Sequence, residues 1–224
     1  MISTSTTRKT VGFAKNRVLQ VLLAWYAAVW LWAALAPLDR HDWFLENLLV
    51  FALVAVLIGT YRAFPLSDLS YLLITAFMTL HAVGSHYTYA QVPLGSWVQN
   101  AFGFSRNHFD RIVHFSFGLL MAYPIREVFL RVANTRGIWA YYLPLDVTLA
   151  FSALYEIIEM VVATMVAPGT GDAYLGTQGD VWDAQKDMGL AALGALLCMV
   201  LTALIRRLRT PRPILLAGGM NETA

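Results

Sequence analysis

Charged residues are scarce in this chain, and their scarcity excludes most soluble folds. Asp, Glu, Lys and Arg make up 13% of the 224 residues, whereas 58% are hydrophobic. A soluble domain is about 25% charged. The mean hydropathy is also positive, at +0.57. The composition therefore indicates a membrane protein that has little chain left for a soluble domain.

Several other features are absent. The one cysteine, Cys198, lies within an apolar run, so no intrachain disulfide can form. A single cysteine does not indicate whether the protein resides in an oxidising or a reducing compartment. The sequence has no internal repeat, no low-complexity tract and no glycine-rich nucleotide-binding motif. The basic run "RRLRTPR", residues 206–212, is short, and we interpret it as a topology anchor. We therefore expect no nucleic-acid partner.

Long apolar runs are what the sequence does contain. A membrane-spanning helix needs about 20 largely apolar residues. We predict an all-α, polytopic membrane protein, a six-transmembrane-helix bundle in the lipid bilayer. The predicted spans are residues 17–36, 45–60, 69–88, 110–132, 143–166 and 186–206. The predicted organisation is an N-terminal tail (1–16), a single membrane domain (17–206) and a basic C-terminal tail (207–224).

The basic residues predict the orientation of the bundle. With six spans, both termini lie on one side of the membrane. Of the 16 Lys and Arg residues, 12 fall on that side, and only Arg40, Arg106, Arg111 and Lys186 fall on the other. Loops rich in Lys and Arg stay in the cytoplasm. We therefore expect both termini to be cytoplasmic and the loops 37–44, 89–109 and 167–185 to face outward.

Ionisable residues gather in the outer parts of the predicted spans, where they are costly unless they face the bundle interior or water. The candidate site residues are His81, His86, Asp110, Arg111, His114, Glu156, Glu159, Asp180, Asp183 and Asp187. Asp110 and His114 are four residues apart, and Glu156 and Glu159 are three apart, so each pair shares a helix face. Because His81 and His86 are five apart, we expect one of them to lie beyond the helix end.

These residues carry more negative than positive charge. Six carboxylates face Arg111, Lys186 and Arg106, which leaves about three or four acids without a cation. A bound metal ion, protons held by the acids or imidazoles, or access of water would each resolve this surplus. Each set also has a plain structural reading, because acids favour helix N-termini and a lone histidine in a membrane is often a hydrogen-bond partner.

Three runs resemble a known arrangement. "FDRIVHFSFG", "YEIIE" and "GDVWDAQKDMGLAALGAL" resemble the order of motifs in VanZ-like membrane proteins. The stretch from about 45 to 206, above all "YLGTQGDVWDAQKDM", is similar to bacterial YjdF-type inner-membrane proteins. The matching positions are Asp110, Arg111, His114, Glu156 or Glu159, Asp183, Asp187 and Gly189. The resemblance implies a multi-pass protein of the bacterial inner membrane, linked through VanZ to cell-envelope biology, and implies no particular reaction.

The leading functional hypothesis is an outward-facing, metal-dependent hydrolase or transferase that acts on a lipid or cell-envelope precursor. Mixed His and carboxylate ligands suit Zn, Mn or Fe. The expected metal ligands are His81, His86, His114, Glu159, Asp183 and Asp187. Asp110, Arg111, Glu156 and Asp180 are expected to serve the reaction, with Arg111 binding an anionic group of the precursor. The alternatives are a proton- or cation-coupled transporter or binding protein, and a non-catalytic envelope scaffold.

Overall fold

The computed structural model describes residues 12–165 and 175–209, and all the regular structure in these ranges is helical. After a 3-10 turn at Phe13–Lys15, the chain forms seven described α-helices. These are α1 (Arg17–Ala34), α2 (Arg40–Thr60), α3 (Asp68–His86), α4 (Pro93–Phe102), α5 (Phe109–Arg131), α6 (Trp139–Met165) and α8 (Asp183–Arg209).

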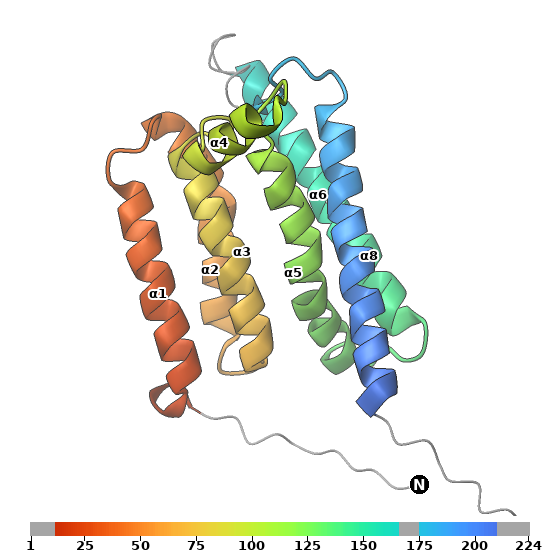
Figure 1. The fold of residues 1–224 in the computed structure, drawn as a ribbon. Helices are drawn as coiled ribbons and strands as arrows, with labels where there is room; N and C mark the ends of the chain where they lie inside the picture. The colour runs from red at the N-terminus through yellow and green to blue at the C-terminus, as the bar shows by residue number, and fades with distance from the viewer. Residues whose placement is uncertain (1–11, 166–174, 210–224) are drawn as a thin grey trace, which may run out of the picture.

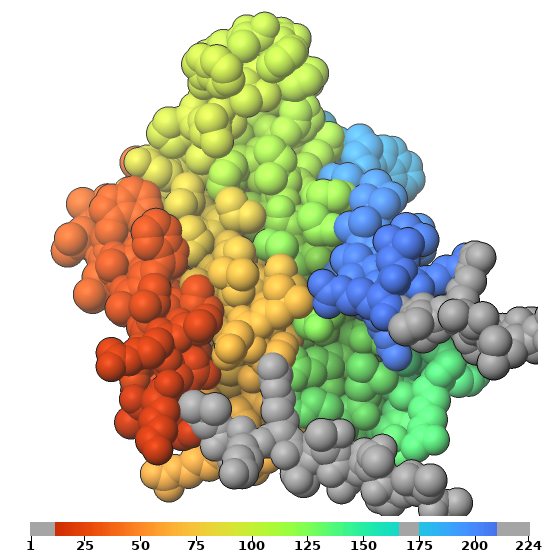
Figure 2. Space-filling model, turned by 60° about the horizontal axis from the view of Figure 1, so that its bottom comes forward, coloured from red at the N-terminus to blue at the C-terminus, as the bar shows by residue number. Residues whose placement is uncertain are grey.

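Six of these helices run side by side, and the short α4 lies across one end of the bundle (Figure 1). We call this end the α4 end; Figure 2 shows the segment around α4 standing out there. The start of α1 and the end of α8 both lie at the opposite end. That end also carries most of the Lys and Arg residues, including Arg62, Arg136 and Arg207, and we call it the basic end. The chain therefore has the polytopic arrangement that the sequence predicts.

Five of the helices are long and apolar enough to cross a membrane: α1, α2, α5, α6 and α8. The sixth long helix, α3, runs beside them, and α1, α2 and α5 all pack against it. Its buried residues include His81, Ser85 and His86. A helix packed against three others can carry such polar groups on its packed faces, because they find partners inside the protein rather than lipid.

One predicted boundary was wrong. The second helix begins at Arg40 rather than residue 45, because the Asp39 side chain accepts hydrogen bonds from the backbone N–H groups of His41 and Asp42 at 2.8 and 2.9 Å. Such an N-cap satisfies the free donors of the first turn. The predicted outer loop 89–109 contains the short helix α4, which has Pro93 in its first turn and is capped after Phe102 by Gly103 with φ +66°.

The expectation that His81 or His86 lies beyond the helix end was also wrong, because α3 continues through His86. Both side chains are buried. Residues 1–11 and 210–224 of the predicted tails, and residues 166–174 of the third outer loop, lie outside the described part of the chain.

The closest helix packing joins α5 to α8, and two glycines make it possible. A Cβ on Gly118 would overlap the backbone oxygen of Ala191, and a Cβ on Gly194 would overlap that of Phe115. A Cβ on Gly189, by contrast, would meet nothing within 4 Å. Small residues let helix backbones approach each other in membranes. The close approach brings the α4 ends of α5 and α8 together, where the candidate site residues lie.

Candidate metal site at the α4 end

An ion-pair network joins the loop before α5 to the start of α8. Both terminal nitrogens of Arg106 donate to the Asp183 carboxylate, and Arg111 donates to Asp180 and, at 3.2 Å, to Asp183. Lys186 donates to Asp180 at 2.6 Å. Arg106 and Asp183 are both buried, with 4% of each residue exposed. Bidentate pairs of this kind hold the two partners in a fixed orientation.

The loop that precedes α8 wraps around the same arginine. Arg106 donates to the backbone oxygens of Gly176 and Thr177 at 3.2 and 3.1 Å. The Gln178 side chain accepts a hydrogen bond from the backbone N–H of Asn107 and donates one to its carbonyl oxygen, at 2.9 and 3.0 Å. The "GTQGD" run, residues 176–180, thus binds the loop between α4 and α5 through these hydrogen bonds, and this contact gives the run a structural role.

A second group of polar residues lies next to this network, and we call it the carboxylate–histidine cluster. Its members are Asp110 and His114 of α5, Glu156 and Glu159 of α6, and Asp187 of α8. The His114 Nε2 atom lies 3.5 Å from Asp110 Oδ1 and 3.5 Å from Glu156 Oε1. One ligand atom each from Asp110, His114 and Asp187 lies within 4.8 Å of the other two.

His114, Glu159 and Asp187 of the cluster are buried, Asp110 and Glu156 are partly buried, and some of the polar atoms lack partners. Asp187 is 2% exposed, and its Oδ1 atom is buried without a hydrogen-bond partner among the described residues. The Oε1 atom of Glu156 is likewise buried without a hydrogen-bond partner among the described residues. Within residues 12–165 and 175–209, no Lys or Arg forms an ion pair with any acid of this cluster. The cations of the neighbouring network are taken up by Asp180 and Asp183.

This geometry fits a divalent metal ion. Imidazole nitrogens and carboxylate oxygens lie about 2.0–2.2 Å from zinc, so tetrahedral ligand atoms are about 3.4 Å apart. One ligand atom each of Asp110, His114 and Asp187 lies within 4.8 Å of the other two, so these three residues are the ones that could hold such an ion. A cation there also balances carboxylates that have no other positive partner. The donor set of oxygens and one imidazole suits Mn, Fe or Zn.

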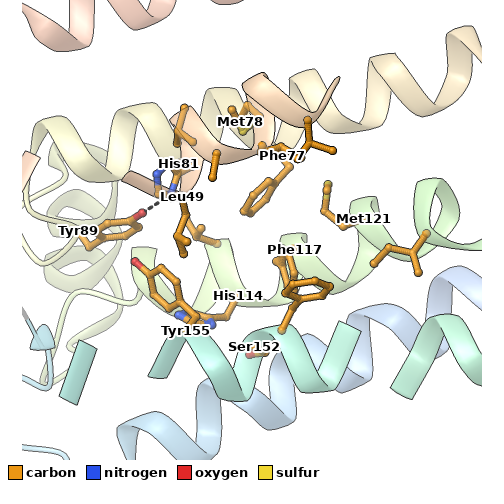
Figure 3. Close-up of a pocket in the computed structure, with 17 residues that line it drawn as sticks. Leu49, Phe77, Met78, His81, Tyr89, His114, Phe117, Met121, Ser152 and Tyr155 are labelled. Atoms are coloured by element: carbon orange, nitrogen blue, oxygen red, sulfur yellow. Dashed lines mark hydrogen bonds between the residues drawn. The ribbon is translucent and has the colours of Figure 1, made fainter. Parts of the chain in front are cut away.

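His81, expected to be a metal ligand, has both ring nitrogens occupied. Its Nε2 lies 3.2 Å from the backbone oxygen of Glu46, which can only accept, so Nε2 carries the proton. Its Nδ1 then accepts a 2.6 Å hydrogen bond from the Tyr89 hydroxyl (Figure 3). The structure therefore places His81 beside the cluster but without a free nitrogen for a metal.

His86 lies farther away, at the contact between α1 and α3. Its Nδ1 is 3.0 Å from the backbone oxygen of Ala33, and its ring stacks on Trp32 with 4.6 Å between the ring centres. Trp32 and Tyr87 are its aromatic neighbours. His86 therefore links two helices, and the structure does not bring it to the carboxylate–histidine cluster.

Two titratable groups outside the spans are shifted by this environment. The hydrogen bond from Lys186, with those from Trp182 N–H and Arg111, lowers the pKa of Asp180 from 3.8 to about 2. Partial burial and the nearby Arg111 and Arg106 lower the pKa of His108. Both shifts favour the state in which Asp180 is charged and His108 is neutral at physiological pH.

Comparison with known proteins identifies the family of the chain. The family described as "Predicted membrane protein (DUF2238)" matches residues 18–208. The chain belongs to this family. It is 42% identical over 166 residues to the inner membrane protein YjdF of Escherichia coli (strain K12), which covers 74% of this chain and 79% of that protein. The YjdF-type resemblance is thereby confirmed. No solved structure matches the chain. This DUF2238 protein is a multi-pass protein of the bacterial inner membrane.

Three residues of the DUF2238 chain near the cluster were missed in the sequence. Glu46 is 2% exposed, and its Oε2 accepts a 2.6 Å hydrogen bond from Tyr155. An acid inside the apolar run of α2 is the same signal that singled out Glu156, so Glu46 was predictable. Tyr89 lies in the loop after α3. Nothing in the neighbouring sequence distinguishes it from tyrosines that only anchor the protein at the membrane surface. The acids of α2, α5, α6 and α8 thus meet at one end of the bundle.

Proposed function

We propose that this chain is a divalent-metal-dependent hydrolase or transferase that acts on a lipid or cell-envelope precursor at the outer face of the inner membrane. The observation that carries the proposal is the group of Asp110, His114 and Asp187, of which the first is partly buried and the other two are buried, with ligand atoms within 4.8 Å of one another. Glu156, whose Oε1 is 3.5 Å from the His114 ring, would move the proton. A metal held there would make a bound water nucleophilic towards a phosphate or ester.

The proposal includes six membrane spans and cytoplasmic termini. The six long helices run side by side, and the basic residues gather at the end that carries the start of α1 and the end of α8. By the positive-inside rule this end is cytoplasmic, so the cluster opens outward. The VanZ-like order of the same motifs supports a cell-envelope precursor as substrate. Arg111, whose side chain is 19% exposed, would bind an anionic group.

Metal analysis of the purified full chain tests the proposal. We expect about one Zn, Mn or Fe per chain, and loss of the metal in Asp187→Asn and His114→Ala. Free metal at about 100 times its dissociation constant stabilises the folded state by about 2.7 kcal/mol. Removal of the metal by a chelator should therefore lower the unfolding temperature by at least about 5 °C. Asp146→Asn is the matched control, because Asp146 is an exposed acid of α6. Absence of stoichiometric metal, with no effect of the chelator, would overturn the proposal.

The buried acids also suit a proton-coupled transporter, but transport requires a polar path across the membrane. Below His114, the space between α2, α3, α5 and α6 is lined by apolar residues such as Phe117, Met121 and Ile125. This lining argues against passage of an ion towards the basic end. Proton-driven uptake in proteoliposomes that is lost in Glu156→Gln would favour transport over catalysis. A scaffold role would be favoured by a cellular phenotype that survives Glu159→Gln, His114→Ala and Asp183→Asn.

A further inference from the structure

An apolar cavity of about 450 Å³ lies between α2, α3, α5 and α6, beside the carboxylate–histidine cluster. This volume is within the range of roughly 300–1,000 Å³ that is usual for ligand pockets. Figure 3 shows that most of its polar residues gather at one end, where His81, Tyr89, His114 and Tyr155 lie. Apart from Ser152, the rest of the wall is hydrocarbon and aromatic, including Phe77, Phe117 and Met121. A ligand that fits this wall has a long apolar part and one polar end.

The cavity opens to the side of the bundle rather than only to its end. Leu49 and Val56 of α2 and Phe151 of α6 line it, and they are also 45%, 58% and 56% exposed on the helix surfaces. These surfaces belong to two helices that are long and apolar enough to cross the membrane. What lies against them is therefore the hydrocarbon of the bilayer, so a lipid reaches the cavity between α2 and α6 without entering water.

The length of the cavity matches one leaflet of the membrane. Along α5 its lining runs from Val113 to Ile125, and a helix rises about 18 Å over this stretch at about 1.5 Å per residue. Half of the hydrocarbon thickness of a bilayer is about 15 Å. The polar end lies towards the α4 end, on the side where the headgroups of that leaflet lie. The cavity therefore has the length and the polarity of a single lipid chain in that leaflet.

We propose that the cavity holds one hydrocarbon chain of a bilayer lipid, which enters between α2 and α6 and places its polar group at His114 and Tyr155. His114 belongs to both the cavity and the cluster, since its Nε2 lies 3.5 Å from Asp110 and from Glu156. A chain seated in the cavity therefore brings the carbon nearest the headgroup to the acids of the site. The inference rests on the proposed function only in making that headgroup the part on which the site acts.

Photolabelling of the full chain in nanodiscs tests the inference. The probe is phosphatidylglycerol with a diazirine at the end of one acyl chain, in a bilayer of phosphatidylethanolamine and phosphatidylglycerol. We expect the label at the inner end of the cavity, at Met121 and Ile125, which line it. Ala52→Trp places an indole in the space of the chain and should lower this labelling about tenfold, because a close-packed cavity cannot hold both.

The matched control is Ala55→Trp, which carries the same change on the exposed surface of α2 outside the cavity. If Ala52→Trp fails to fold, Val56→Trp within the cavity and Ile58→Trp outside it repeat the comparison, since these residues are 58% and 71% exposed. Labelling of Met121 and Ile125 that is the same in the cavity variants and their controls would show boundary lipid only and would overturn the inference.

The outcome is separable from that of the metal analysis. Asp187→Asn removes a proposed ligand but leaves the cavity wall intact, because Asp187 does not line it. We therefore expect this variant to keep the label at Met121 and Ile125. Cavity labelling in a protein without metal would support this inference and contradict the proposed function. Metal binding without cavity labelling would support the proposed function and contradict this inference.

Discussion

The Tyr155 hydroxyl donates a 2.6 Å hydrogen bond to Oε2 of Glu46, and this bond joins α6 to α2 at the polar end of the apolar cavity. Glu46 is almost completely buried, so its carboxyl group depends on partners within the protein. In Tyr155→Phe that oxygen loses its donor, at a cost of about 1–3 kcal/mol. We expect the unfolding temperature in detergent to fall by about 3–10 °C. Tyr142→Phe, at a tyrosine that is 47% exposed, should change it little. Equal effects of the two substitutions would contradict this role.

The packing of α5 on α8 gives a second prediction. A Cβ at Gly194 meets the backbone of Phe115, which cannot move as a flexible side chain can. We expect Gly194→Ala to destabilise the fold by about 1–3 kcal/mol, the usual cost of overpacking. Gly189→Ala is the control on the same helix, because a Cβ there meets nothing within 4 Å. Thermal unfolding of both variants measures the difference. A cost at Gly189 as large as that at Gly194 would show that helix backbone effects, not the contact, decide the result.

The ion-pair network predicts an acid-sensitive stability. Hydrogen bonds, first of all from Lys186, lower the folded-state pKa of Asp180 from 3.8 to about 2. A lowered pKa stabilises the fold above the unfolded value, so this contribution is complete above about pH 4 and is lost as the pH falls towards 2. The unfolding temperatures of the protein and of Asp180→Asn should therefore converge between pH 4 and pH 2. Lys186→Met should shift this convergence to higher pH. A gap between the protein and Asp180→Asn that stays constant over this range would exclude the mechanism.

The orientation predicts which loops a reagent outside the cell can reach. In a Cys198→Ala background, Ser105→Cys lies in the loop before α5 and Ala133→Cys in the loop after it; both residues are exposed. A membrane-impermeant maleimide should label Ser105→Cys in spheroplasts and Ala133→Cys only after lysis. Labelling in the opposite order would place the carboxylate–histidine cluster on the cytoplasmic side.

Sequence spacing was informative wherever the partners share a helix. The four-residue separation of Asp110 and His114 brings their side chains to 3.5 Å, as a helix requires. Spacing could not show that Asp183 and Asp187, also four residues apart, have different partners. Asp183 binds Arg106, which is 77 residues away, whereas Asp187 lies with Asp110 and His114. Contacts between distant segments depend on helix packing, here on Gly118 and Gly194. The spacing of residues within one helix does not predict such contacts.

The partners of the two histidines of α3 were unpredictable for the same reason. His86 stacks on Trp32 of α1, and His81 binds a backbone oxygen of α2 and the hydroxyl of Tyr89. The presence of several long apolar runs and the excess of acids in their outer parts were visible in the sequence alone. The division of those acids into a paired network and an uncompensated cluster required the structure.

The central position of α3 has a consequence for how the protein is made. The hydropathy of this helix is too low for it to count among the candidate spans, and its buried histidines, His81 and His86, find their partners in α1, α2 and the loop after α3. A segment with such groups partitions poorly from the translocon into lipid on its own. It must therefore be held at the translocon until its neighbours can surround it, and insertion of α1, α2 and α3 is expected to be one concerted step of biogenesis.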